Sequence, residues 1–273
     1  MTTEQEYVLG TDAEELTRLG IQHRLWSDRA VDLWRRGGLR VGSRMLDIGC
    51  GPGYASLDAA QLIGTDGAVF GVDMSGRFID EAARRARDLG LPWAEFVEGN
   101  VQELASVCAD RRFDLAYARW VLCFCPDPGA VIAGAAEVLE PGGSILIQDY
   151  YNYHAMTTGP RIDAVQRYVD AIKRQWRDNG GNPDVMGDVP GLLAEHGFEV
   201  VHHAVYQKVA RPTDQIWAWP ETWIASSLHR LIDSGHLEEA DAEAMRDWFR
   251  AAPSVPGRFY MPPPVHEIHA VKR

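Results

Sequence analysis

The sequence predicts an α/β fold in which a mainly parallel sheet carries helices on both faces, giving three layers. Two observations predict it. Apolar runs typical of buried strands alternate with helical segments from residue 44 to residue 150, and turn residues such as Gly, Pro and Asp separate them. Strands that alternate with helices form parallel sheets, because each crossover helix returns the chain to the edge where the next strand begins.

The expected elements of the first half follow in order. A helix is expected over 12–37, because Leu16, Leu19 and Trp34 recur near helical spacing and a Gly-Gly pair ends the pattern. Five strands are expected over 44–49, 68–73, 94–100, 113–120 and 144–150. Three further helices are expected over 54–64, 75–90 and 128–143, and Ser75 can cap the second of these.

After residue 150 the alternation becomes irregular. Helical patterns occupy 155–187 and 213–250, and the second of them is rich in tryptophan. Between them, 189–210 predicts a helix, a turn at Gly197 and a sixth strand. Residues 265–273 predict a closing strand. The second half therefore interrupts the sheet with helical insertions.

Composition limits the possible functions. The net charge of -12 argues against a duplex-binding protein, which needs a basic face. No apolar run reaches the roughly 18 residues of a membrane span, and the polar N-terminus does not resemble a signal peptide. We therefore expect a cytoplasmic protein with reduced thiols and no metal site. The cysteines are Cys50, Cys108, Cys123 and Cys125.

A glycine-rich turn, "LDIGCGPG", follows the first expected strand. Gly49, Gly51 and Gly53 lack the Cβ atoms that would block a ligand at the carboxyl end of the strand. A dinucleotide would require the spacing G-x-G-x-x-G, but Tyr54 stands where the third glycine would be, and Pro52 removes an N–H donor. A dehydrogenase is therefore a distant alternative.

The second expected strand ends in a carboxylate. Asp73 lies twenty residues beyond Gly53, where an acidic side chain can accept hydrogen bonds from both hydroxyls of a ribose. It could instead be an ordinary aspartate flanking the helix that begins near Ser75. Met74 could lie against a purine or pack in the core.

Five segments occur in order and at the right separations: "LDIGCGPG", "GVDMS", "EGNVQEL", "FDLAYARWVLCF" and "VLEPGGSILI". Over residues 40–150 the chain resembles the class I S-adenosylmethionine-dependent methyltransferases, in particular the small-molecule, quinone-biosynthesis-like group (methyltransferase type 11/25). The resemblance implies a Rossmann-like seven-stranded sheet of order 3-2-1-4-5-7-6, whose seventh strand is antiparallel.

The resemblance also implies which residues hold the cofactor, S-adenosyl-L-methionine. They are Asp47, Gly49, Gly51, Gly53, Asp73, Met74, Asn100, Val101, Ala118 and Arg119, with Tyr7 and Gln22 in an N-terminal cover. Asn100 departs from the aspartate usual in the family, although its carbonyl oxygen can still accept a hydrogen bond. Arg119 could pair with the cofactor carboxylate or lie on the surface. Trp26 could join the cover or pack its own helix.

The cofactor's sulfonium carries an activated methyl group, so the protein needs mainly to align the acceptor and exclude water. Tyr150, Tyr151 and His154 follow the fifth strand and are the candidate catalytic residues, with Asp149 beside them. His154 is the first choice for a base, because histidine titrates near neutrality. The tyrosines could instead stabilise the sulfonium without any base.

The acceptor is expected to be a planar or apolar small molecule. Tyr153, Trp217, Trp219 and Trp223 are the candidate pocket residues, although the tryptophans could equally pack the inserted helices. We favour O- or N-methylation, with C-methylation of a quinone-like or polyketide-like acceptor, or non-catalytic binding of the cofactor, as alternatives. The product would be S-adenosyl-L-homocysteine.

We expect one methyltransferase domain over 1–273. In it, 1–38 forms a helical cover, 39–150 the cofactor-binding core, and 151–190 with 212–255 the insertions that shape the acceptor pocket. The first helix and the inserted helices could also form a homodimer face.

Overall fold

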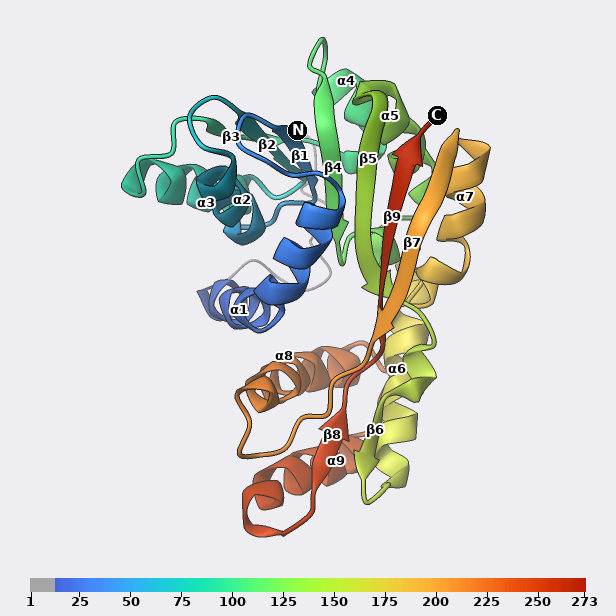
Figure 1. Ribbon diagram of the computed structural model, residues 1–273. Helices are drawn as coiled ribbons and strands as arrows, with labels where there is room; N and C mark the ends of the chain where they lie inside the picture. The colour runs from blue at the N-terminus through green and yellow to red at the C-terminus, as the bar shows by residue number, and fades with distance from the viewer. Residues whose placement is uncertain (1–12) are drawn as a thin grey trace.

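The computed structural model describes residues 13–273, so the predicted cover residue Tyr7 lies outside the described residues. A seven-stranded sheet has the order β3-β2-β1-β4-β5-β9-β7, in which β9 runs antiparallel to both β5 and β7 (Figure 1). Numbered within this sheet, the order is 3-2-1-4-5-7-6, which confirms the predicted fold. The strands are β1 (Arg44–Ile48), β2 (Ala68–Asp73), β3 (Ala94–Glu98), β4 (Phe113–Arg119), β5 (Leu139–Tyr150), β7 (Phe198–Tyr206) and β9 (Val265–Lys272).

Helices cover both faces of this sheet. The longer helices of the first half begin within one residue of their predicted starts, as periodicity and start signals would place them. They are α1 (Ala13–Arg36), α2 (Tyr54–Ile63), α3 (Gly76–Asp88) and α5 (Pro128–Val138), with the short α4 (Leu104–Val107) before α5. Ser75 caps α3 as predicted, since its side chain accepts a hydrogen bond from the Phe78 N–H.

Each face of the sheet has its own apolar core, because successive strand side chains point in opposite directions. On one face, Met45, Leu115 and Leu146 pack with α1 and α2. On the other, Leu46 and Ile147 pack with residues of α4, α5 and α7 (Val189–Glu195). Burial of both faces explains why the central strands read as continuous apolar runs.

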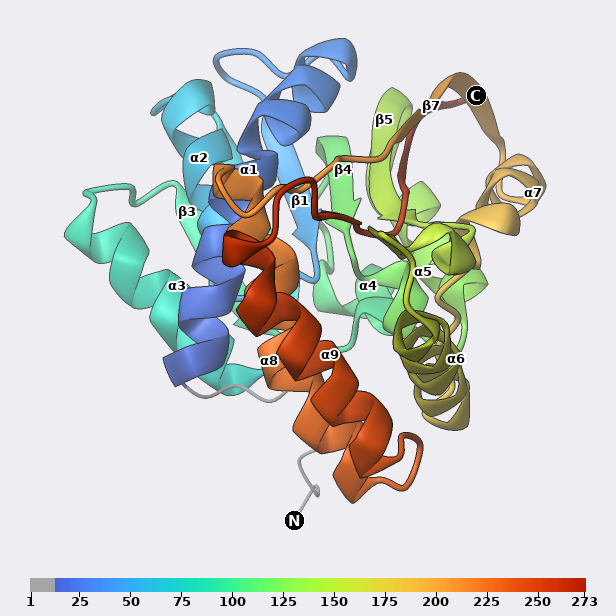
Figure 2. The same cartoon turned by 90° about the horizontal axis from the view of Figure 1, so that it is seen from below.

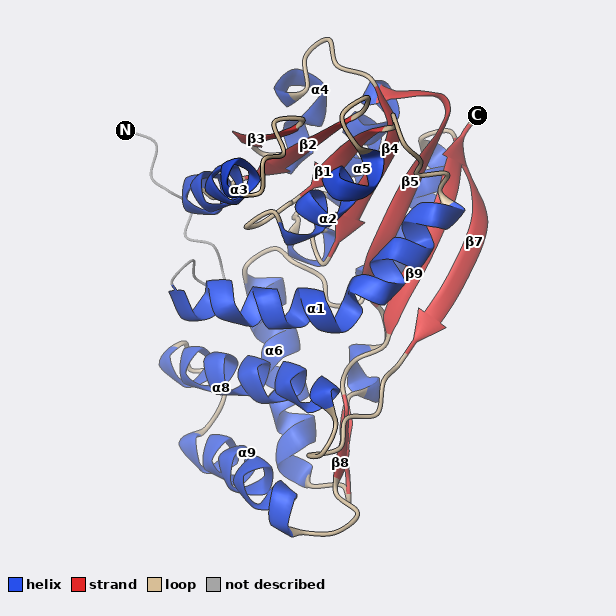
Figure 3. Ribbon diagram, turned by 60° about the vertical axis from the view of Figure 1, so that its left-hand side comes forward, coloured by secondary structure: helices blue, strands red, loops and turns tan. Residues whose placement is uncertain are grey.

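The helical insertions lie beyond the carboxyl ends of the parallel strands (Figures 1 and 2). They comprise α6 (Asp163–Asp178), α8 (Ala218–Asp233) and α9 (Glu239–Ala251), together with a small antiparallel sheet of β6 (Thr157–Gly159) and β8 (Phe259–Met261). Figure 3 shows α1 between the main sheet and the stacked α8 and α9. The strand ends therefore face a second, helical half of the molecule.

Three expectations from the sequence need correction. The helix expected over 128–143 ends at Val138 and β5 begins at Leu139, which already has extended backbone angles. Pro141 cannot continue a helix, so the predicted last turn does not form. The pattern over 155–187 contains β6 as well as α6, and the pattern over 213–250 divides into α8 and α9 at Gly235. Periodicity missed β6 and β8, because each is only three residues long.

Within residues 13–273, no helix is long and apolar enough to cross a bilayer.

A buried polar network attaches α1 to the sheet. Glu267 of β9 is fully buried, and its carboxylate accepts hydrogen bonds from Arg29 of α1 at 3.2 Å and from Gln148 at 3.1 Å. The side-chain amide oxygen of Gln148 in turn accepts a hydrogen bond from the Tyr117 hydroxyl at 2.7 Å. The Arg29 guanidinium also lies 4.0 Å from the centre of the Tyr206 ring. One carboxylate therefore connects α1, β4, β5 and β9.

We expect Glu267→Leu to lower the free energy of unfolding by about 3 kcal/mol, because Arg29 and Gln148 lose a buried partner. Glu267→Gln keeps an acceptor oxygen and should cost about 1 kcal/mol. Urea titrations measure both changes in the free energy of unfolding, provided that the m-value is the same in each variant. Equal midpoints for the wild type and the leucine variant would contradict the role given to this carboxylate.

Candidate active site

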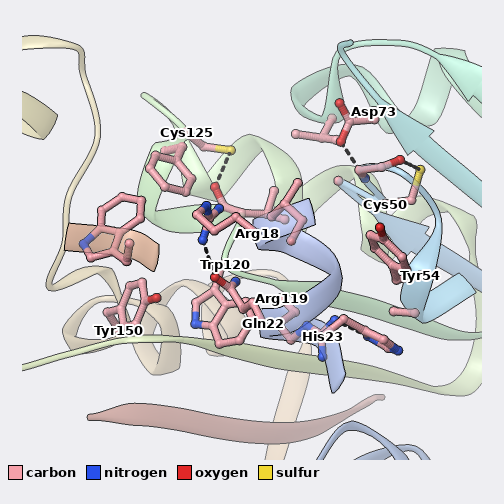
Figure 4. A pocket seen from close by; sticks show the side chains of 18 of the residues that line it. Arg18, Gln22, His23, Cys50, Tyr54, Asp73, Arg119, Trp120, Cys125 and Tyr150 are labelled. Atoms are coloured by element: carbon pink, nitrogen blue, oxygen red, sulfur yellow. Dashed lines mark hydrogen bonds between the residues drawn. The ribbon is translucent and has the colours of Figure 1, made fainter. Parts of the chain in front are cut away.

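A cavity of about 440 Å³ opens at the carboxyl edge of the sheet. Strand ends form one side of it, and α1, α6 and α8 form the other. Figure 4 shows Cys50 and Asp73 at one end and Trp120 and Tyr150 at the other. Most of the predicted site residues line it, namely Gln22, Asp47, Gly49, Gly51, Asp73, Met74, Asn100, Val101, Arg119, Tyr150, Tyr153, Trp219 and Trp223.

The glycine turn and the end of β2 hold each other in place. The buried Asp73 carboxylate accepts hydrogen bonds from the Gly51 N–H at 2.8 Å and the Ser75 N–H at 2.9 Å. Burial nevertheless raises its pKa. Gly49 has φ +66°, and a Cβ there would collide with the Val121 side chain. Gly49 is therefore required both by its backbone conformation and by the close approach of the loop after β4.

A second carboxylate lies at the end of β1. Asp47 is buried and accepts a short hydrogen bond from the Ser56 hydroxyl of α2. Burial raises the pKa of Asp47 to about 6, against the opposing effects of Ser56 and of the positive charge on Arg119. A cationic group in the cavity would stabilise the ionised form of this carboxylate.

Arg119, the last residue of β4, supplies the positive charge. Its Nη2 lies 2.9 Å from Nδ1 of His23, and Nε2 of His23 lies 2.9 Å from Oδ2 of Asp58. The other terminal nitrogen, Nη1, is buried and has no hydrogen-bond partner within residues 13–273. A buried charged donor without a partner is costly, so this nitrogen marks a place for an anionic group of a ligand.

The loop after β4 depends on a third carboxylate, that of Asp149 in β5. This fully buried side chain accepts hydrogen bonds from the backbone N–H groups of Val121 at 3.2 Å, Cys123 at 3.1 Å and Tyr150 at 2.9 Å. Burial raises its pKa to about 6 despite these bonds. Asp149 does not line the cavity, so its position favours a structural role over that of a base.

The same loop begins with a strained residue. Trp120 has φ +55°, a left-handed conformation that is unusual for a bulky side chain. Its ring stacks on Tyr150 with centroids 6.1 Å apart and lies 6.0 Å from the ring of Trp219. The strained backbone thus directs the indole into the cavity.

Aromatic side chains from β5, α6, α8, β8 and the loops after β4 and β5 continue this wall. We call it the aromatic chamber; its members are Trp120, Phe124, Tyr150, Tyr153, Trp176, Trp219, Trp223 and Tyr260. Tyr153 packs edge-to-face on Tyr150 at 5.3 Å, and Trp176 lies 5.5 Å from Tyr153. No histidine or carboxylate belongs to this set, and burial raises the pKa values of Tyr150, Tyr153 and Tyr260 well above the usual range.

Helix α1 closes the cavity with polar side chains. Arg18 is buried and forms a two-point ion pair with Glu15 at 2.6 and 2.7 Å. Its Nη1 donates to Oε1 of Gln22 at 2.7 Å, and the same oxygen accepts from the Trp219 indole N–H at 3.1 Å. Gln22 therefore connects α1 to α8 across the cavity.

Five predicted site residues do not line the cavity, namely Gly53, Ala118, Tyr151, His154 and Trp217. Gly53 and Ala118 lie behind it, against α3 and in the sheet core. Tyr151 is 43 % exposed and packs on His266. Trp217 packs on Trp248 and Phe249 of α9. The tryptophan-rich helix thus contributes two of its three predicted side chains to the cavity.

The position of His154 argues against its predicted role as a base. Its side chain is 45 % exposed and lies between Asp170 at 2.9 Å and the Lys173 ammonium at 2.8 Å. Lys173 also pairs with Asp184, which accepts from the Tyr153 N–H at 2.8 Å. His154 thus belongs to a polar cluster behind Tyr153 and does not face the cavity.

Sequence reasoning missed several lining residues, chiefly His23, Trp120, Trp176 and Tyr260. Trp120 was within reach, because it is the last residue of the strand expected over 113–120, at the carboxyl edge of the sheet. His23 lies on a helix with no motif. Tyr260 lies in a three-residue strand that periodicity cannot detect.

We expect Asp149→Ala to expose the loop after β4, because two loop N–H groups lose their buried acceptor. Amide exchange at Val121 and Cys123 should quicken by about ten-fold or more. Glu137→Ala, a change on α5 outside the lining, serves as the control. Unchanged exchange in the Asp149 variant would show that other contacts hold this loop.

Comparison with known proteins agrees with this geometry. Residues 39–210 match the family described as "Methyltransferase domain". An arsenite methyltransferase of Aquipseudomonas alcaligenes is 33 % identical over 58 % of this chain and 44 % of its own. A ubiquinone/menaquinone biosynthesis C-methyltransferase of Vibrio campbellii is 27 % identical over 65 % of this chain and 71 % of its own.

A solved structure from Bacillus halodurans, described as a candidate methyltransferase, has a TM-score of 0.60 at 18 % identity. The match covers 89 % of this chain and 98 % of that one, which shows the shared fold. The chain spans less than half the length of the arsenite methyltransferases it matches, at 44 % and 46 %. The family match covers residues 39–210, and the strand order and the carboxylates at the strand ends agree with it. The chain therefore belongs to the methyltransferase domain family.

Proposed function

We propose that this protein transfers a methyl group from S-adenosyl-L-methionine to a flat, largely apolar small molecule. One observation carries the proposal. A single cavity joins a polar end, which holds Asp47, Asp73 and Arg119, to the aromatic chamber. The polar end suits a zwitterionic nucleoside, and the chamber suits an apolar acceptor.

The polar end offers a partner for each charged or polar part of the cofactor. The Asp73 carboxylate could accept hydrogen bonds from the ribose hydroxyls, and the turn glycines would leave room for the chain of the amino acid. The partnerless Arg119 Nη1 fits the carboxylate of the amino acid, while Asp47 fits its ammonium group. Met74 and Asn100 lie at the edge of the cavity, where the adenine would fit.

The aromatic chamber supplies alignment, with no base of its own. The lone pair of the acceptor would form the new bond to the methyl carbon while the sulfur takes the electrons of the breaking S–C bond. Tyr150 and Tyr153 stay protonated, since burial raises their pKa values. We infer that the acceptor atom is already deprotonated, or readily loses its proton, when it enters the chamber.

Buried donors in the chamber indicate what else the acceptor carries. Trp120, Trp223 and Tyr260 line the cavity, and within the described residues their indole N–H groups and hydroxyl are buried without a hydrogen-bond partner. An indole N–H can only donate. Carbonyl or hydroxyl oxygens on the acceptor would satisfy these groups, so O- or C-methylation of an oxygen-bearing ring is favoured over N-methylation.

The cysteines argue against arsenite, the substrate in the name of the matched Aquipseudomonas protein. Cys50 and Cys125 line the cavity, but burial raises the pKa of Cys125 to about 12 and that of Cys50 well above its usual range. Both are therefore neutral thiols, whereas soft ions bind thiolates.

We also propose the single-domain organisation over 1–273, with 151–190 and 212–255 shaping the chamber.

We expect calorimetry to detect binding of S-adenosyl-L-homocysteine but not of NAD, because the turn has the wrong glycine spacing for a pyrophosphate. Asp73→Ala should abolish that binding. Incubation with S-adenosyl-L-methionine and a panel of phenols, quinones and amines should release S-adenosyl-L-homocysteine with the oxygen-bearing rings. Tight NAD binding, or turnover confined to amines, would overturn the proposal.

We expect cofactor affinity to weaken below about pH 6. Asp47 has a pKa of about 6 in the free protein, and an ammonium ligand favours its ionised form. Binding therefore releases a proton below that pH, and affinity should fall by up to about ten-fold per pH unit. Calorimetry from pH 5 to pH 8 measures this slope. Asp47→Asn should bind more weakly at pH 8 and lack the slope; an equal slope in that variant would contradict the assignment.

A further inference from the structure

His23 lies where two cavities meet. Its ring lines the main cavity and also a second, outer cavity of about 510 Å³ between α1, α2 and α3. The ring stacks on Tyr54 with centroids 5.8 Å apart and an interplanar angle of 16°. The Tyr54 hydroxyl in turn donates to the Leu16 carbonyl at 2.9 Å and accepts from Arg85 at 2.9 Å. The imidazole is thus held on a fixed plane.

The hydrogen bonds of His23 fix its tautomer. Nδ1 lies 2.9 Å from Arg119 Nη2, and a guanidinium can only donate, so Nδ1 must accept. Nε2 lies 2.9 Å from the Asp58 carboxylate, which accepts, so Nε2 must carry the proton. Only the neutral ring with its proton on Nε2 satisfies both partners. Burial, together with the nearby charge of Arg119, lowers the pKa of His23, and this favours the neutral ring.

The Arg119 guanidinium needs such a partner. It lies 5.1 Å from the centre of the Trp120 ring and 6.0 Å from that of Tyr117. Ring faces attract a cation without fixing its rotation. The hydrogen bond to Nδ1 is directional, and it leaves Nη1 as the buried nitrogen that is still without a partner among the described residues.

We propose that His23 is a positioning residue for cofactor binding: with Asp58 behind it, it rotates the Arg119 guanidinium so that Nη1 presents its N–H to the carboxylate of the cofactor. This inference rests on the proposed function, since it needs the carboxylate-bearing cofactor. It adds to that function a chain of hydrogen bonds that runs from Asp58 of α2 through His23 of α1 to Arg119 of β4. The chain explains why a helix without a motif carries a buried histidine at this place.

The test compares two replacements of His23. In His23→Asn, the amide oxygen takes the place of Nδ1 and can still accept from Arg119. In His23→Leu, no acceptor remains. His229→Leu, at an exposed residue of α8 outside both cavities, is the matched control. Calorimetry with S-adenosyl-L-homocysteine measures the dissociation constant of each variant, and circular dichroism compares their folding.

We expect the dissociation constant to rise about ten-fold or more in His23→Leu, within about three-fold of the wild type in His23→Asn, and not at all in the control. Equal affinities of His23→Leu and the wild type would overturn the inference, as would equal losses in both His23 variants. A wild type that does not bind S-adenosyl-L-homocysteine would instead overturn the proposed function.

A second measurement needs no ligand. Nitrogen-15 spectra of the ring distinguish a protonated from an unprotonated nitrogen. We expect His23 Nδ1 to be unprotonated and Nε2 protonated at pH 7 in the wild type. Asp58→Ala and Asp58→Asn should each keep Nδ1 unprotonated, because Arg119 still donates to it. The other tautomer should appear only when Asp58→Ala is combined with Arg119→Leu, which removes both partners. A protonated Nδ1 in the wild type would overturn the chain from Asp58 to Arg119.

Discussion

Three buried aspartates at the carboxyl edge of the sheet hold the site together. Asp47, Asp73 and Asp149 lie at or beside the ends of β1, β2 and β5, where burial raises the pKa of each. Such carboxylates are costly unless hydrogen bonds compensate them. Asp73 and Asp149 are compensated by backbone N–H groups, and in this way they fix the glycine turn and the loop after β4. The shape of the cavity follows from these bonds.

Helix α1 belongs both to the sheet and to the cavity. Near its C-terminal end, Arg29 binds the buried Glu267. Nearer its N-terminal end, Gln22 and His23 face the cavity and contact α8 and β4. One rigid helix thus joins the sheet to the inserted helices. A change in the packing of α1 would move the polar end of the cavity and the aromatic chamber together.

The sequence predicted the sheet well because strands and helices of ordinary length have a recognisable periodic pattern of apolar residues. It predicted the polar end of the cavity for a related reason, since Asp47, the turn glycines and Asp73 lie close to strand ends, and parallel strands end at one edge. Prediction was poorer for the chamber. His154 follows β5 by only four residues, yet its side chain turns toward Asp170 and Lys173. Chain proximity to the edge does not set side-chain direction in a loop.

The sequence by itself determined the class of fold and the carboxylates that meet at the strand ends, because these depend on local pattern and on the rule that parallel strands end together. The strand order was implied only by the resemblance to the methyltransferases. Only the tertiary structure decided which distant side chains complete the cavity. His23, Trp176 and Tyr260 come from three separate elements and reach it through helix packing and a short sheet. Their meeting depends on long-range contacts, which no local pattern of residues records.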